Sequence, residues 1–242
     1  MAADSNGLSA SVRLRLPDHE ELVYPWLEAD VSILSMAAPW RTFVSYKGQR
    51  HYSGCFWSAT QGDLILYESR LELARLLFAD FDRAVRGIVA QPFLLEAEVD
   101  GRRRRHVPDF LLLTEALPIV VDVKPASRVS KPDIAFVLAW TRRVVEARGW
   151  VYEVWSEPPP IELANVRLLA GYRREWLFDP AVLAELREAD LEGMSLGAVR
   201  LALPHWQPEI VAASALHLLW QKHFLADLAD PLDATTVLRV AA

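Results

Sequence analysis

Two short apolar segments, separated by four residues, constrain the fold of this chain most strongly. They are "HVPDFLLL" (residues 106–113) and "PIVVDVKP" (118–125), joined by "TEAL". Runs of this kind are typical of strands, and so short a link predicts an antiparallel hairpin. Each segment nevertheless contains an aspartate, Asp109 or Asp122, although aspartate is disfavoured in strands. The two carboxylates therefore need a chemical reason to lie inside the hairpin.

The segments around the hairpin predict an α/β fold. Residues 67–88 have apolar side chains at helical spacing, and "IVAQPFLLEAEV" (88–99) predicts one strand. After the hairpin, residues 131–150 predict a helix and residues 150–156 a further strand. The expected order is helix, three strands, helix, strand.

The hairpin brings the two aspartates close together. Asp122 and Lys124 are two residues apart on one strand, so their side chains share a face. Pro108 marks an irregular strand end, where the neighbouring Asp109 can turn toward Asp122. Two adjacent carboxylates repel each other unless a cation joins them. A hard divalent ion with oxygen ligands, Mg²⁺ or Mn²⁺, resolves that repulsion.

These residues, in this order, resemble the PD-(D/E)XK nucleases, which carry a helical Glu, then "PD", then an acidic residue two places before Lys. More narrowly, the chain is similar to the TnsA-like transposon endonucleases. Four pieces carry that resemblance: "SRLE" (69–72), "QPF" (91–93), "PDFLL" (108–112) and "DVKP" (122–125). Each piece alone is a weak signal, whereas four in order are specific. The likeness covers residues 60–156 and implies a restriction-endonuclease-like αβββαβ core.

The resemblance implies an active site. One or two Mg²⁺ (or Mn²⁺) ions would be held by Asp109, Asp122, the Val123 carbonyl and Glu72, with Lys124 orienting the attacking water. Glu68 competes with Glu72 for the role of the helical carboxylate, because residues four apart share a helix face. Glu68 and Gln91 are otherwise expected to support the site without contacting the metal.

Each of these residues also has an ordinary structural interpretation. Asp109 could cap its own backbone at a strand start. Asp122 and Lys124 could form a surface ion pair, which contributes little to stability. Glu72 could only complete a capping box with Ser69. It is the combination and order of the residues that favour the active-site interpretation.

Four consecutive arginines, Arg102, Arg103, Arg104 and Arg105, precede the first aspartate. A run of charge is usually a solvated hairpin tip, but the position of this one beside Asp109 favours contact with DNA phosphates. His106 follows the run and is either an ordinary strand residue or a further DNA contact. The tryptophans are expected to lie mainly in the core and at interfaces.

Composition bounds the class of protein. With 52% hydrophobic residues the chain can bury a core, and its single cysteine excludes a disulfide framework. The first residues lack the layout of a secretory signal and no apolar run is long enough to cross a membrane, so a cytoplasmic protein is expected. The net charge of −6 is unusual for a protein that binds DNA alone, which favours help from partner proteins.

Three regions are expected: an N-terminal lead-in with short strands (1–58), the nuclease core (59–172), and a small, mostly helical domain (173–242). The last region predicts helices over 180–203 and 208–228, and its final residues suggest a β wing or a partner-bound tail, as in a winged-helix-like module. Its acidic bias favours a protein partner over DNA.

The expected function is therefore that of a DNA endonuclease subunit of a heteromeric transposase, which cuts double-stranded DNA at the transposon 5′ end. The resemblance implies a DDE-type transposase as one partner and a transposition ATPase regulator, bound through residues 173–242, as another. Two alternatives stay open. One is a stand-alone PD-(D/E)XK nuclease of a restriction or repair system, and the other is an inactive assembly module that retains the nuclease fold.

Overall fold

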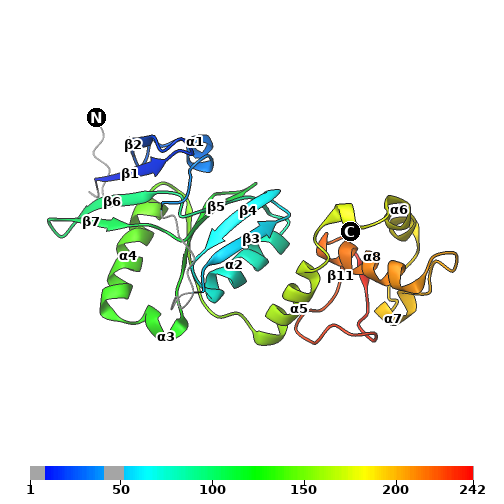
Figure 1. The fold of residues 1–242 in the computed structure, drawn as a ribbon. Coiled ribbons are helices and arrows are strands. Elements are labelled where there is room, and N and C mark those ends of the chain that lie inside the picture. The colour runs from blue at the N-terminus through cyan, green and yellow to red at the C-terminus, as the bar shows by residue number, and fades with distance from the viewer. Residues whose placement is uncertain (1–8, 41–51, 242) are drawn as a thin grey trace. The chain divides into compact units, whose positions relative to one another are not determined.

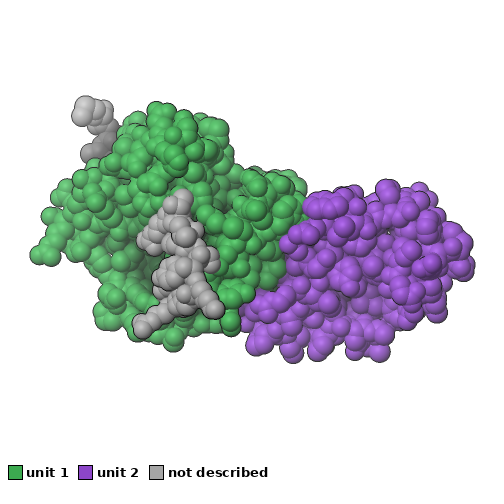
Figure 2. Space-filling model, viewed as in Figure 1, with its two compact units in different colours: residues 1–79, 84–157 green, residues 80–83, 158–242 purple. Residues whose placement is uncertain are grey.

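The computed structural model describes residues 9–40 and 52–241. They form two compact units, coloured separately in Figure 2: residues 1–79 with 84–157, and residues 80–83 with 158–242. The division after residue 157 places the expected boundary at 172/173 inside the second unit.

The first unit contains a four-stranded sheet in the order β10-β9-β8-β5. Its strands are β5 (Val85–Ala90), β8 (Phe110–Thr114), β9 (Ile119–Val123) and β10 (Val151–Trp155). Strands β8 and β9 pair antiparallel, which confirms the predicted hairpin, and β10 pairs parallel with β9. The chain passes from β9 to β10 through α3 (Ala126–Val129) and α4 (Pro132–Ala147), visible in Figure 1. The predicted mixture of helices and strands is confirmed.

A second, antiparallel sheet of the same unit has the order β2-β1-β6-β7. Its strands are β1 (Ala10–Arg15), β2 (Glu21–Pro25), β6 (Leu94–Val99) and β7 (Arg102–His106), and the short helix α1 (Val31–Ser35) follows β2. The N-terminal residues are thus paired with the middle of the chain, because β1 lies against β6, rather than forming a separate lead-in.

Two strand predictions were wrong in detail. Residues 88–99 form parts of β5 and β6, which belong to different sheets, and the break falls at Gln91, whose φ of +46° ends the extended conformation. The four arginines are not a hairpin tip: they form strand β7, and Asp100 and Gly101, with φ of +53° and +68°, make the turn. Two positive φ values are the signature of the tight hairpin turn that suits twisted strands.

The hairpin of β3 (Gly54–Ser58) and β4 (Asp63–Tyr67) leads into helix α2 (Arg70–Phe81). The predicted helix over 67–88 therefore begins later and ends earlier than expected. Ser69 precedes the helix, and its hydroxyl accepts from the Glu72 backbone N–H at 3.1 Å, as predicted for an N-cap. The second half of the predicted capping box differs, because the Glu72 carboxylate accepts from the Glu68 backbone N–H and the Ser69 hydroxyl rather than from the Ser69 backbone N–H.

The core of the first unit lies among its two sheets and α4, and tryptophans are central to it. Trp26 contacts the rings of Phe93 and Trp150, and its Nε1 donates to the Val144 carbonyl at 2.8 Å. Trp140 on α4 is 1% exposed. The expectation of core tryptophans holds for these positions.

The second unit is mostly helical, as predicted. It contains α5 (Pro160–Ala170), η1 (Glu175–Leu177), α6 (Pro180–Glu188), α7 (Leu196–Val199), α8 (Pro208–Trp220), β11 (Phe224–Leu225) and β12 (Arg239–Val240). The single helix expected over 180–203 is two helices, and the one expected over 208–228 ends at Trp220. Strand β12 pairs with β11 rather than within a separate terminal hairpin. Among the residues that the structure describes, no helix has the length and apolar character needed to span a membrane.

Candidate active site

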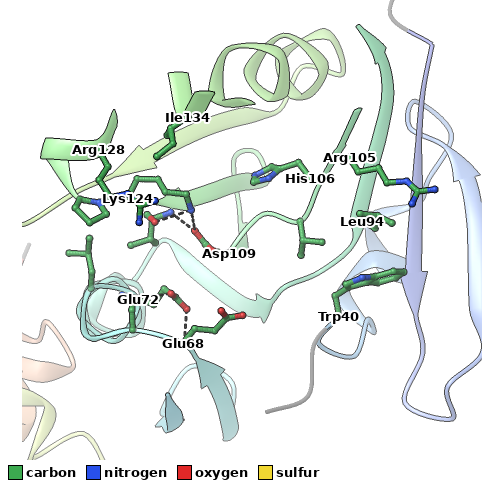
Figure 3. A pocket seen from close by; sticks show the side chains of 15 residues that line it. Trp40, Glu68, Glu72, Leu94, Arg105, His106, Asp109, Lys124, Arg128 and Ile134 are labelled. Atoms are coloured by element: carbon green, nitrogen blue, oxygen red, sulfur yellow. Dashed lines mark hydrogen bonds and ion pairs between the residues drawn. The ribbon is translucent and has the colours of Figure 1, made fainter. Parts of the chain in front are cut away.

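A cleft of about 650 Å³ opens in the first unit beside the β8–β9 hairpin. Its lining includes Glu68, Glu72, Asp109, Val123 and Lys124, which come from the start of α2, the start of β8 and the end of β9 (Figure 3). Five of the residues singled out from the sequence are therefore brought to one place, although they are spread over much of the chain.

Asp109 is fixed at the crossing of three strands. Its backbone N–H donates to the Val121 carbonyl at 3.0 Å, and its own carbonyl accepts from the Gln91 N–H at 2.9 Å. Its carboxylate Oδ2 accepts from the Val123 backbone N–H at 2.6 Å. The side chain therefore reaches across to β9 and does not cap its own backbone, which excludes the ordinary interpretation of this residue.

Lys124 places a positive charge where three oxygens converge. Its Nζ lies 3.0 Å from Asp109 Oδ2, 3.1 Å from the Val123 carbonyl oxygen and 3.5 Å from Asp122 Oδ1. These are the three oxygens expected to hold a divalent ion. Two carboxylates and a backbone carbonyl form the hard oxygen set that Mg²⁺ and Mn²⁺ prefer. The donor set therefore fits such an ion, which would compete with the ammonium for the same oxygens.

Asp122 is held from behind the cleft. It is 0% exposed and its carboxylate contacts His106 Nε2 at 2.8 and 2.9 Å, while the Tyr152 hydroxyl donates to Oδ2. The interpretation of Asp122 and Lys124 as a surface pair is therefore wrong. Burial alone would raise the pKa of Asp122, but the hydrogen bond and charge of His106, with the charge of Lys124, outweigh it and lower the pKa.

The two aspartates differ in their electrostatics. Burial raises the pKa of Asp109, and the neighbouring Asp122 charge adds to this, although Lys124 opposes both. The pKa of Lys124 is itself raised, since the attraction of Asp109 and Asp122 outweighs the effect of burial. Asp122 therefore stays ionised more readily than Asp109. The protonation of Asp109 depends on which charges lie beside it in the cleft.

Glu72 serves both the helix and the cleft. Its Oε2 accepts from the Glu68 backbone N–H at 2.7 Å and its Oε1 from the Ser69 hydroxyl at 2.8 Å. Burial, together with the charge of Asp109, raises the pKa of Glu72 to about 7. A carboxyl group of this kind changes protonation near neutral pH, so Glu72 is suited to exchange a proton within the cleft.

Gln91 connects the parts of the site. Its side-chain amide donates to Glu68 Oε1, and its backbone N–H donates to the Asp109 carbonyl. It is 8% exposed and holds a left-handed φ, a conformation that costs free energy for any residue with a Cβ. Gln91 therefore links Glu68 to the hairpin. Glu68 precedes α2, so it does not share a helix face with Glu72 as the sequence predicted.

The arginines of β7 are partly engaged within the protein. Arg103 and Arg105 form ion pairs with Glu96, which is 4% exposed, and the Arg104 guanidinium stacks on Phe136. Burial would raise the pKa of Glu96, but the hydrogen bond and charge of Arg103, with the charge of Arg105, lower it overall. Of the four arginines, Arg105 is the one that lines the cleft. DNA contact by Arg102–Arg105 stays a prediction.

Sequence reasoning missed several contributors. The sequence places His106 beside the arginine run, but no local pattern indicates its contact with Asp122. Tyr152 lies on β10, and only the parallel register with β9 brings it near Asp122. Trp40 and Arg128 also line the cleft, and no local motif distinguished either from an ordinary core or surface residue.

No protein-family model matches the chain, and no curated protein matches it significantly. Within residues 9–40 and 52–241, no three Asp, Glu, His or Cys side chains are grouped as a metal site by themselves. The oxygens that converge on the Lys124 ammonium are two carboxylates and the Val123 carbonyl, and Glu72 lines the same cleft.

Proposed function

We propose that this chain is a Mg²⁺-dependent DNA endonuclease with a restriction-endonuclease-like core, and that it works as one subunit of a heteromeric transposase. The observation that carries the proposal is the convergence of Asp109, Asp122 and the Val123 carbonyl on one cationic point in a cleft, with Lys124 and Glu72 beside it. Their order along the chain is that of the nuclease pattern it resembles.

In this proposal Asp109, Asp122 and the Val123 carbonyl would hold the ion, and Glu72 would reach it directly or through water. Such an ion would supply a more acidic water and would offset charge on the phosphate oxygens. Lys124, released from the carboxylates, donates to the attacking water or to a phosphate oxygen. Glu72, with a pKa of about 7, accepts a proton near neutral pH. The products are a 5′-phosphate and a 3′-hydroxyl.

The partners follow from the resemblance to TnsA-like endonucleases. A DDE-type transposase would cut the other strand, and a transposition ATPase regulator would bind residues 173–242. The net charge of −6 supports a need for partner proteins, because a protein that binds DNA phosphates by itself usually has a basic surface. Site choice would then come from the assembled complex.

The first test is Mg²⁺ or Mn²⁺ binding by calorimetry to the wild type, Asp109→Asn and Asp122→Asn. Asn keeps the size of the side chain, so loss of binding reports the lost charge rather than a cavity. The matched control is Asp18→Asn, because Asp18 is exposed and caps Glu20 outside the cleft. Binding that is lost in both cleft variants and kept in the control supports the proposal.

A nicking assay on duplex DNA then separates the candidate functions. Cleavage that requires a transposase partner supports the proposed subunit, whereas cleavage by the chain alone supports a stand-alone nuclease. Lys124 already forms ion pairs with both aspartates without a metal, which favours an inactive assembly module as the second candidate. The module is favoured if the isolated wild-type chain binds neither Mg²⁺ nor Mn²⁺, and if it also binds no Ca²⁺ when duplex DNA is present.

A further inference from the structure

The wall of the cleft farther from the lysine is aromatic and apolar. Trp40 and Leu94 lie there with Arg105, apart from Glu72 and Lys124 (Figure 3). Leu94 and Arg105 come from the paired strands β6 and β7, while Trp40 comes from the segment after α1. The hydrolysis proposed above does not use this wall.

The indole of Trp40 is fixed before any ligand arrives. The Arg15 guanidinium stacks over the ring at 5.0 Å, and its Nη1 donates to the Trp40 carbonyl at 3.2 Å. The Trp40 backbone N–H donates to the Gln91 carbonyl at 3.3 Å. The ring is only partly buried and contributes surface to the cleft. A preordered aromatic ring loses little conformational entropy when a flat ligand stacks on it.

Trp40 is also tied to the proposed metal site through two backbone hydrogen bonds. Gln91 accepts from Trp40 through its carbonyl and donates to Asp109 through its N–H. Hydrogen-bonded backbones lie about 5 Å apart, so two such steps separate the backbones of Trp40 and Asp109 by about 10 Å. Stacked DNA advances about 3.4 Å per nucleotide along one strand, so the Trp40 backbone lies on the order of three nucleotides from a phosphate bound at Asp109.

We propose that Trp40, with Leu94, forms a subsite for a nucleobase that has left the base stack, so that the cleft prefers DNA with an unpaired nucleotide beside the scissile phosphate. This inference rests on the proposed nuclease function. In an intact duplex both faces of every base are covered by neighbouring bases, so an indole has access only where the stack is interrupted. Arg128 on the cleft lining and Lys124 supply positive charge for the adjoining phosphates.

The chemistry of the cleft favours a nucleotide over a purely apolar ligand. Glu68, Arg105 and Arg128 give the cleft charges of both signs, with Arg105 beside the aromatic wall and Arg128 on the side of Lys124 (Figure 3). A nucleobase presents a flat face to the ring and polar edges to such groups. The volume of about 650 Å³ falls within the range of small-molecule sites and leaves room for one extruded nucleotide.

The test compares two DNA ligands in Ca²⁺ buffer, a short duplex with one unpaired 2-aminopurine and the fully paired duplex of the same sequence. We expect the wild type to bind the unpaired form more tightly and to quench its fluorescence. Trp40→Ala should weaken that binding about 5- to 150-fold, which is the range for loss of one base–aromatic stack, and should leave affinity for the paired duplex unchanged. Trp40→Phe should retain most of the preference.

Two further variants keep the test decisive. Trp40→Leu preserves apolar bulk without a stacking face, so it should fold as Trp40→Phe does and still lose the quenching. Trp176→Ala removes an exposed tryptophan of the second unit and should change neither affinity. Equal binding of both duplexes by the wild type, or a preference that survives in Trp40→Leu, would overturn the subsite and leave the nuclease proposal standing. Absence of any DNA binding, with or without partners, would overturn both.

Discussion

At the scale of single residues, Lys124 is the centre of the site. Its ammonium satisfies two carboxylates and a carbonyl that would otherwise repel one another in a half-buried cleft. A divalent ion satisfies the same oxygens with twice the charge. The site therefore has two mutually exclusive cations, one built into the chain and one taken from solution.

This competition predicts an unusual effect of Lys124→Ala. Without the ammonium, Mg²⁺ no longer has to displace a cation from Asp109 and Asp122, so we expect roughly tenfold tighter binding, a difference of about 1.4 kcal/mol. The same variant should lose cleavage, because no group replaces the lysine beside the phosphate. Calorimetry and a nicking assay measure the two effects, and Lys124→Arg is the control that keeps the charge. Weaker metal binding in Lys124→Ala would contradict the shared-oxygen geometry.

Glu72 gives the fold a dependence on pH. Its pKa is raised to about 7 in the folded chain, first by burial and then by Asp109, from an ordinary value of 4.5. Between these values the folded state binds the proton more tightly than the unfolded state. The stabilisation is therefore complete below pH 4.5 and is lost as the pH rises to about 7, on the order of 3 kcal/mol.

The variant Glu72→Gln tests this dependence, because a Gln side chain can still accept a hydrogen bond from the Glu68 backbone N–H or the Ser69 hydroxyl but cannot ionise. Without divalent ions, we expect the wild-type free energy of unfolding, corrected for the ordinary carboxylates, to fall between pH 4.5 and 7. The variant should lack that fall. Denaturant titrations at a series of pH values measure the difference. Parallel curves for the two proteins would show that Glu72 ionises normally.

At the scale of elements, the hairpin was predictable and its surroundings were not. The β8–β9 pair depends on apolar segments and a short link, which are local features that the sequence displays. The break at Gln91 depends on a positive φ in a residue other than glycine, which no local pattern reveals. The contact of Tyr152 with Asp122 depends on a parallel pairing whose register is set by α4 and the sheet.

The same distinction applies to the site residues. Asp109, Lys124 and Glu72 were found because their types and order match a known pattern, and each lines the cleft. Asp122 was predicted from the same pattern, and its Oδ1 lies 3.5 Å from Lys124 Nζ, but its full burial and the contacts of His106 and Tyr152 with its carboxylate were not predicted. The partners of a residue across a sheet are long-range contacts, and hydrophobic periodicity carries no information about them.

Gln91 lies between β5 and β6, and its positive φ is unfavourable for a residue with a Cβ. Gln91→Ala loses the amide contact with Glu68 and keeps the cost of a Cβ at φ +46°. Gln91→Gly loses the same contact but removes that cost, so it should be more stable than Gln91→Ala by about 1 kcal/mol. Thermal unfolding measures the difference. A glycine variant no more stable than the alanine variant would show that the junction adopts another conformation.

At the scale of the whole molecule, helix α2 contributes residues to both compact units. Residues 80–83, which include the last two residues of α2, are grouped with the second unit, where the Phe81 ring contacts Trp220 at 5.1 Å and lies under the Lys222 ammonium. Leu76, which is 0% exposed on the same helix, belongs to the first unit. A single helix therefore supplies buried residues to two compact units.

This arrangement predicts opposite effects of two changes made five residues apart on α2. Phe81→Ala should destabilise the second unit by about 3–5 kcal/mol and lower amide protection in α8, while β9 keeps its protection. Leu76→Ala should cost about 2–5 kcal/mol and lower protection in β9 while sparing α8. Hydrogen exchange resolved along the chain measures both. If each change lowered protection equally in α8 and β9, the units would unfold as one, and the C-terminal region could not serve as a separately folded partner-binding domain.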